Sequence, residues 1–244
     1  MVEEAAAATP PSPGPDSALG RLVGAFVSPV RTFAAIAAKP TFLVPLVLWT
    51  ALSFLVSELV LSRTDWRSVI VESSSHREQK LTDAQIDQAV EGSRKFAWLW
   101  EVIAVAVPTI IAVITAGALW MACQAFGWEL RFRQSLGVTA HAYLPGVVAS
   151  IAMFAILWGR STIDPQSLDD ILRTNPGFLV SRHADKTLHS LLSSFDLLSF
   201  WTMGLLVLGL SAAAKASRGR MAALVLSLWG LYVLGKTGLG ILFS

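Results

Sequence analysis

The chain has 244 residues, of which 54% are hydrophobic and only 15% are charged. A soluble domain is about 45–50% apolar and about 25% charged, so this composition is typical of a membrane protein. The formal net charge of +2 is too small to indicate a nucleic-acid partner, since the basic residues lie at the ends of apolar segments and form no stripe, and the single cysteine excludes a disulfide within the chain. We therefore expect the lipid bilayer, and no nucleic acid, as a partner.

The N-terminal region changes character near residue 18. Residues 1–18 are rich in alanine and proline and have few apolar groups to bury, so we expect a disordered tail. Residues 19–39 contain two short apolar stripes at helical spacing, with basic residues beside them. This pattern predicts either two amphipathic helices lying on the membrane surface or two short helices packed on a bundle.

Five apolar segments follow, and each is long enough to cross a bilayer core, which takes about twenty helical residues. They are approximately residues 42–61, 98–123, 136–158, 195–214 and 221–243. We therefore predict an all-α polytopic membrane protein, a bundle of five transmembrane helices with an amphipathic N-terminal segment. Residues 19–244 would form one domain.

Two polar segments interrupt the spans. The first, residues 62–95, has balanced charge and is typical of a water-facing loop. Within it, Thr82 and Gln85 have the spacing of a capping box, which predicts the start of a helix that leads into the second span. The second polar segment covers residues 160–185.

The short loops indicate the orientation of the chain. Lys215, Arg218 and Arg220 form a basic turn between the last two spans, without an acidic residue among them. Arg131 and Arg133 lie in the other short loop, on the same side of a five-span bundle. Short loops rich in lysine and arginine stay in the cytoplasm. We therefore expect a cytoplasmic N-terminus and a C-terminus outside.

Three groups of residues occur in a characteristic order. They are Ser28-Pro29 with Phe33 and Lys39-Pro40; Phe132-Arg133-Gln134-Ser135-Leu136 with Tyr143-Leu144-Pro145; and Phe195-Asp196-Leu197-Leu198-Ser199-Phe200-Trp201 with Gly209, Ser217-Arg218-Gly219-Arg220 and Trp229. In order and spacing these groups resemble the Yip domain, named for the Ypt-interacting-protein family of the secretory pathway, in the form of its bacterial members. The resemblance covers residues 28–236.

The resemblance implies a five-helix integral membrane domain with a cytoplasmic N-terminus, and for a bacterial-type member the inner (plasma) membrane. Eukaryotic relatives bind prenylated small GTPases and vesicle-coat machinery. The Asp-Leu-Tyr-Gly-Pro stretch of that branch is absent before the first span, so GTPase binding is not implied here. What the resemblance implies is a non-enzymatic protein that organises membrane or partner proteins in a trafficking-like role.

The last span contains a sequence that matches the phosphate-binding loop pattern, Gly230-Leu-Tyr-Val-Leu-Gly-Lys236-Thr237. Such a loop needs a strand before it and a solvated helix after it, whereas this segment lies inside an apolar span. We therefore reject nucleotide binding. The glycines here favour close approach of neighbouring helices, which is compatible with a homo-oligomer.

Four charged residues lie within or at the ends of the spans, and the alternating direction of the spans places them near the outer face: Glu58, Glu101, Asp196 and Lys236. Charges in a bilayer are costly unless they are paired. Two interpretations remain open, a packing and topology device or a cation or proton site. The second would make the protein a small transporter or channel.

No pair of histidine or cysteine residues has metal-ligand spacing on one helix, and no nucleophile elbow is present. We therefore expect no catalytic, metal or cofactor site, and no enzyme. The preferred interpretation is an interaction with an unidentified membrane or cytoplasmic protein, and the transporter or channel is the alternative. Four residues of the N-terminal segment are the predicted contact surface, Arg21, Phe26, Arg31 and Phe33.

Overall fold

A computed structural model describes residues 17–74, 81–180 and 186–242. Its regular elements are helices, and the described chain has one isolated bridge, between Thr64 and Ile163. The all-α prediction is therefore confirmed. Of the predicted tail, residues 1–16 lie outside the described residues, as do the last two residues of the chain.

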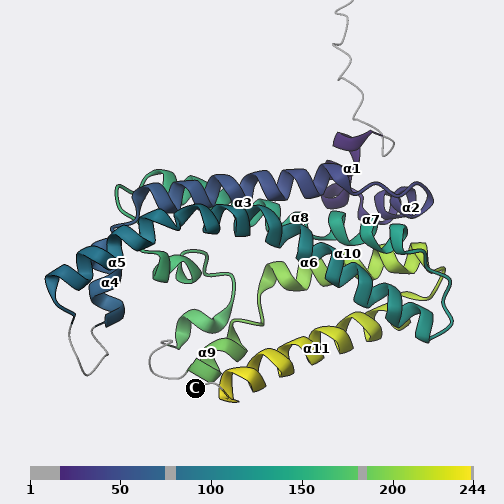
Figure 1. The fold of residues 1–244 in the computed structure, drawn as a ribbon. Helices are drawn as coiled ribbons and strands as arrows, with labels where there is room; N and C mark the ends of the chain where they lie inside the picture. Colours follow the sequence, from purple (N-terminus) through teal and green to yellow (C-terminus); the bar gives the residue numbers. More distant parts are fainter. Residues whose placement is uncertain (1–16, 75–80, 181–185, 243–244) are drawn as a thin grey trace, which may run out of the picture.

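Four helical segments in the described chain are long and apolar enough to cross a membrane. They are α3 (Leu43–Arg63), α6 (Ala97–Ala125), the pair α7 (Phe132–Ala142) and α8 (Leu144–Trp158), and residues Arg218–Gly238 of α11 (Arg218–Leu242). Figure 1 shows α3 and α6 running side by side along the molecule. The length and the apolar composition of these helices identify the chain as an integral membrane protein.

The predicted fourth span, residues 195–214, forms the shorter helix α10 (Leu197–Ala213). Its 17 residues extend about 25 Å, because an α-helix rises about 1.5 Å per residue. Asp196 caps the beginning of α10, and Lys215 ends the turn after it with a φ of 52°, in the left-handed region typical of the residue that follows a helix. Polar residues at both ends therefore set its length.

The third predicted span begins earlier than residue 136 and has a break within it. The break lies at Tyr143, which separates α7 from α8. Pro145 lies in the first turn of α8 and has no backbone N–H for an intrahelical hydrogen bond. A proline is therefore well tolerated at the start of α8 but would interrupt a helix that continued from α7. The hydroxyl of Tyr143 lies 2.8 Å from the Thr115 hydroxyl of α6, which fastens the break to the neighbouring helix.

Helix α7 lies at the centre of the bundle, with residues 135–142 all buried. The N-terminal helices α1 (Ala18–Val27) and α2 (Pro29–Ala38) pack on it, and α2 also packs on α10. Close contact is possible because Gly209 of α10 faces Val138 and Phe33, leaving no room for a side chain. Of the two interpretations of residues 19–39, the structure therefore shows packing on the bundle.

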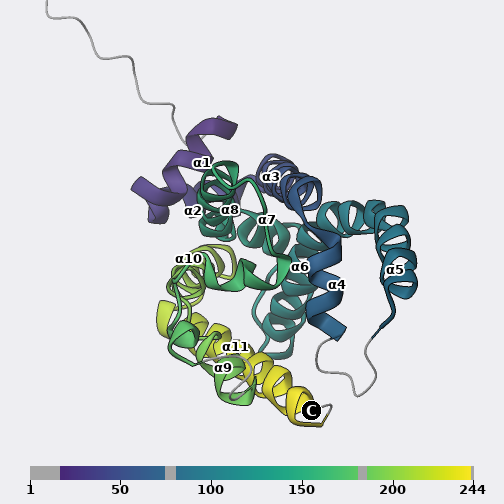
Figure 2. The ribbon, with the colours of Figure 1, turned by 90° about the vertical axis from the view of Figure 1, so that its left-hand side faces the viewer.

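The polar segments form short helices at one end of the bundle (Figures 1 and 2). In the first, α4 (Trp66–Ser74) and α5 (Asp83–Lys95) are joined by ion pairs from Arg67 to Asp83 and Asp87. The capping box of Thr82 and Gln85 is confirmed at the start of α5. The second contains the 3₁₀ helices η1 (Pro165–Asp170) and η2 (Pro176–Leu179), followed by α9 (Lys186–Leu192), which lies against α11.

Residues 230–237, which match the phosphate-binding pattern by letter, are helical throughout and belong to α11. Their backbone N–H groups are therefore engaged in the helix and do not form a loop around a phosphate.

Candidate functional site

The structure brings two of the four predicted charged residues together. Glu58 lies on α3 and Glu101 on α6, and their carboxyl groups are neighbours. Glu58 is exposed and Glu101 is half-buried on the outside of the described chain. Two neighbouring carboxylates repel each other, and a proton or a cation between them lowers that repulsion.

Asp196 and Lys236 have other partners. The Oδ2 atom of Asp196 accepts a hydrogen bond of 2.8 Å from the backbone N–H of Ser199, at the N-terminus of α10. The Lys236 Nζ lies 3.4 Å from the backbone oxygen of Ser190 and 3.5 Å from the Ser194 hydroxyl. Among the described residues, neither charge forms an ion pair. Asp196 serves as a helix cap, and Lys236 fastens α11 to the segment around α9.

The predicted contact surface is mostly turned inward. Arg21 is only 3% exposed and Phe33 is fully buried. Phe26 is half-buried and contacts the Trp201 ring edge to face, with the ring centroids 5.3 Å apart. Arg31 is the member of the set that faces outward.

The buried guanidinium of Arg21 holds the N-terminal helices in place. One of its nitrogens donates to the backbone oxygen of Lys39 at 2.7 Å and to the hydroxyl of Thr41 at 2.8 Å. These acceptors lie at the end of α2 and in the link to α3. Arg21 therefore connects α1 to the beginning of the first span.

The surface that α1 presents instead is apolar. Leu19, Val23 and Val27 are 61%, 47% and 75% exposed, and Val30 at the start of α2 is exposed beside them. Residues spaced by four lie on the same face of a helix. Helix α1 thus has two apolar faces, one packed on the bundle and one open. We call Leu19, Val23, Val27, Val30 and Arg31 the outer face of α1–α2.

The basic turn lies at the same end of the molecule as α1 and α2. Lys215, Arg218 and Arg220 are all exposed, and Figure 1 shows the link between α10 and α11 near α2 and the start of α7. Arg131 and Arg133, which flank the start of α7, are exposed as well. An open apolar face and five exposed basic side chains therefore share this end of the bundle.

Comparison with protein families decides what kind of protein this is. The profile of the Yip1 domain matches residues 23–238, which is nearly the whole chain. The chain belongs to the Yip1 domain family. Neither a curated protein nor a solved structure matches it.

The motif residues of this Yip1 domain protein act largely in its core. Phe33 fills the space in front of Gly209, and Ser135 donates to the backbone oxygen of Ala116 at 2.7 Å in a buried hydrogen bond. Tyr143 and Asp196 shape the break before α8 and the cap of α10. The resemblance seen in the sequence therefore describes how a Yip1 domain folds more than what its surface binds.

The outer face of α1–α2 was missed in the sequence because both faces of α1 are apolar. The signal was nevertheless present, since Leu19, Val23 and Val27 repeat at intervals of four residues. Periodicity shows that a face is apolar. It does not show which of two apolar faces packs on the protein.

Proposed function

We propose that this Yip1 domain protein is a non-enzymatic membrane protein that organises membrane or partner proteins through the outer face of α1–α2. The observation that carries the proposal is the exposed apolar stripe of Leu19, Val23 and Val27 beside exposed basic side chains. Large exposed apolar patches rimmed by polar groups are typical of interaction surfaces. The Yip family is not known as an enzyme family, which agrees with this role.

The geometry supports a surface held in a fixed position. Arg21 fastens α1, and α2 packs against α7 and α10 in the core. A surface on rigid elements loses little conformational entropy when a partner binds to it. The basic turn next to it adds attraction for acidic groups, either on a protein or on anionic lipid.

The test is crosslinking in native membranes followed by mass spectrometry, with the double variant Val23→Ser and Val27→Ser. We expect reproducible protein crosslinks in the original chain and their loss in the double variant, because the apolar contact area is removed. The matched control is Ala18→Ser with Ala34→Ser, since both alanines are exposed on the same two helices. Crosslinks that survive in the double variant would contradict the proposal.

The pair of Glu58 and Glu101 favours a second candidate function, a small transporter or channel for protons or cations. Its two carboxyl groups are neighbours, and both lie on helices long enough to span the membrane. A flux assay in proteoliposomes with Glu101→Gln separates the two functions. A transporter would lose flux and keep its crosslinks, whereas a partner-organising protein would show no flux to lose.

A further inference from the structure

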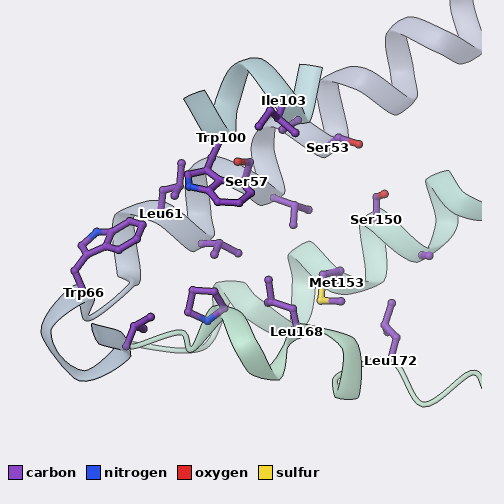
Figure 3. A pocket seen from close by; sticks show the side chains of 16 residues that line it. Ser53, Ser57, Leu61, Trp66, Trp100, Ile103, Ser150, Met153, Leu168 and Leu172 are labelled. Carbon is purple, nitrogen blue, oxygen red and sulfur yellow. The ribbon is translucent and has the colours of Figure 1, made fainter. Parts of the chain in front are cut away.

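A pocket of about 710 Å³ lies between α3, α4, α6, α8 and the segment that contains η1 (Figure 3). Its volume is in the range of about 300–1,000 Å³ that is usual for small-molecule sites. Five separate segments contribute to its wall. The pocket therefore exists only in the folded protein and has no motif in the sequence.

The lining is almost entirely apolar. Its polar side chains other than tryptophan are three serines, Ser53, Ser57 and Ser150. The Ser150 hydroxyl donates to the backbone oxygen of Gly146 at 3.0 Å. For the hydroxyls of Ser53 and Ser57, the described residues provide no hydrogen-bond partner. An occupant of this pocket must therefore be mostly hydrocarbon, with room for a polar acceptor beside the serines.

The pocket extends from the end of α3 toward the middle of that helix. Trp66 and Leu61 lie at one end of it, and Ser53 and Ser150 lie at the other (Figure 3). Along α3 the distance from residue 53 to residue 61 is about 12 Å, at about 1.5 Å per residue. Tryptophan is typical of the membrane boundary, so we expect the Trp66 end there and the Ser53 end in the hydrocarbon core.

The polar anchors of Arg63 support this placement. Its guanidinium donates to the backbone oxygens of Trp158 and Arg160, at 2.7 Å and 2.5 Å, and it lies over the Trp158 ring. These groups close the end of α8 beside the link to α4. The Trp66 end of the pocket therefore adjoins a polar, aromatic layer, and the Ser53 end lies within the span.

The pocket is continuous with the surface that the spans present to lipid. Residues next to its lining on the same helices are exposed and apolar: Phe54 and Leu55 on α3, Val102 and Val105 on α6, and Val148 and Ile151 on α8. In an integral membrane protein these side chains contact acyl chains. A chain in the surrounding bilayer can enter a pocket in this surface without crossing water.

We propose that the pocket holds one acyl chain of a membrane phospholipid. The apolar wall of the pocket suits a hydrocarbon chain, and the long direction of the pocket follows α3, as an acyl chain in a bilayer would. The Ser57 hydroxyl lies beside Trp100 (Figure 3) and would donate to the ester carbonyl of the lipid. The proposal does not depend on what the outer face of α1–α2 binds.

The experiment uses the full-length protein in phosphatidylcholine vesicles that contain a phosphatidylcholine with a diazirine in its acyl chain. After illumination, mass spectrometry measures the label on Ile103 and Met153, which line the pocket, relative to Val113 and Ile114, which face lipid on α6. A retained chain spends longer beside the pocket than a lipid at the free surface. We expect the label on the pocket residues to exceed the label on the lipid-facing pair.

Two variants fill the pocket, Ala104→Phe on α6 and Ala149→Phe on α8. We expect the pocket label to fall about tenfold in each, a change of about 1.4 kcal/mol in affinity, with the lipid-facing label unchanged. The matched control is Val105→Phe, which adds the same ring next to Ala104 but on the exposed side of α6. It should leave both labels unchanged. Two filling variants from different helices guard against one that does not fold.

Equal labelling of the pocket and the lipid-facing pair would overturn the proposal, as would a pocket label that both folded filling variants leave unchanged. Crosslinks from the pocket residues to a second copy of the chain would overturn it too, because the occupant would then be protein. The double variant Val23→Ser with Val27→Ser, which changes the outer face of α1–α2, should keep its pocket label. The two proposals therefore fail independently.

Discussion

Single charged residues in this protein mainly stabilise the fold. Arg21 bridges the end of α2 and the link to α3, Asp196 caps α10, and Lys236 contacts the segment around α9. Arg21 and Asp196 each satisfy backbone groups at the end of a helix, and Lys236 adds a contact to the Ser190 oxygen, which also accepts from the Ser194 hydroxyl. The cost of placing charge in an apolar protein is thus offset by hydrogen bonds to the backbone.

The hydrogen bonds of Arg21 can be tested by substitution. Replacing Arg21 with methionine keeps much of the side-chain volume but leaves the oxygens of Lys39 and Thr41 without their donor. We expect a loss of about 1–3 kcal/mol in the free energy of unfolding, which is the usual cost of an unsatisfied buried polar group. Thermal or denaturant unfolding in detergent measures it.

Arg31→Met is the matched control, because Arg31 carries the same charge on the neighbouring helix and is exposed. It should change the stability by less than about 0.5 kcal/mol, as is usual for surface substitutions. An equal loss of unfolding free energy in the two variants would show that Arg21 stabilises the protein by its charge alone and not by its hydrogen bonds to Lys39 and Thr41.

Helix α10 approaches α2 and α7 closely at Gly209, which has no side chain. A Cβ atom at Gly209 would lie 2.4 Å from Val138 and 2.6 Å from Phe33, both buried. Gly204, on the same helix, has no atom within 4 Å of such a position. The contact of α10 with α2 and α7 therefore depends on Gly209 and not on glycine in general.

Two alanine substitutions in α10 test this close contact. Gly209→Ala should destabilise the protein by about 1–3 kcal/mol, because extra volume in a packed core displaces its neighbours. Gly204→Ala should be neutral or stabilising by up to about 1 kcal/mol, since alanine favours a helix over glycine. Thermal or denaturant unfolding in detergent measures both stabilities. A Gly209→Ala protein as stable as the Gly204→Ala protein would contradict the tight contact at Gly209.

At the scale of the whole molecule, the sequence predicted the type and order of the elements well. Runs of apolar residues located the long helices, and Thr82 with Gln85 located the start of α5. Residues 230–237 were assigned to a span against their letter pattern, and they are helical. These predictions depend on local composition and spacing, which a sequence displays directly.

The rotation of each helix about its axis could not be predicted in the same way. Glu58 and Glu101 meet while Lys236 contacts Ser190 and Ser194, because such pairings depend on distances between helices far apart in the chain. Arg21 is buried for the same reason, on a helix with two apolar faces. The pocket, built from five segments, has no signal in any one of them.

The basic turn sets the expected orientation of the molecule. We expect this turn in the cytoplasm and α4 outside. In a background with Cys123→Ala, single cysteines replace Ser217 in the turn and Ser73 in α4, both exposed. A maleimide that cannot cross the membrane should label Ser73→Cys in intact cells and Ser217→Cys only after lysis. The reverse pattern would show the opposite orientation.

The length of α10 has a consequence for the bilayer around it. A helix of about 25 Å is shorter than a hydrocarbon core of about 30 Å. Leu197, Phe200 and Trp201 are exposed on α10, so lipid beside it meets this hydrophobic mismatch directly. Local thinning costs fractions of a kcal/mol per Å, and two copies that share one thinned region deform less membrane than two that lie apart. We therefore expect the protein to favour thinner membranes and the lipid to draw its copies together.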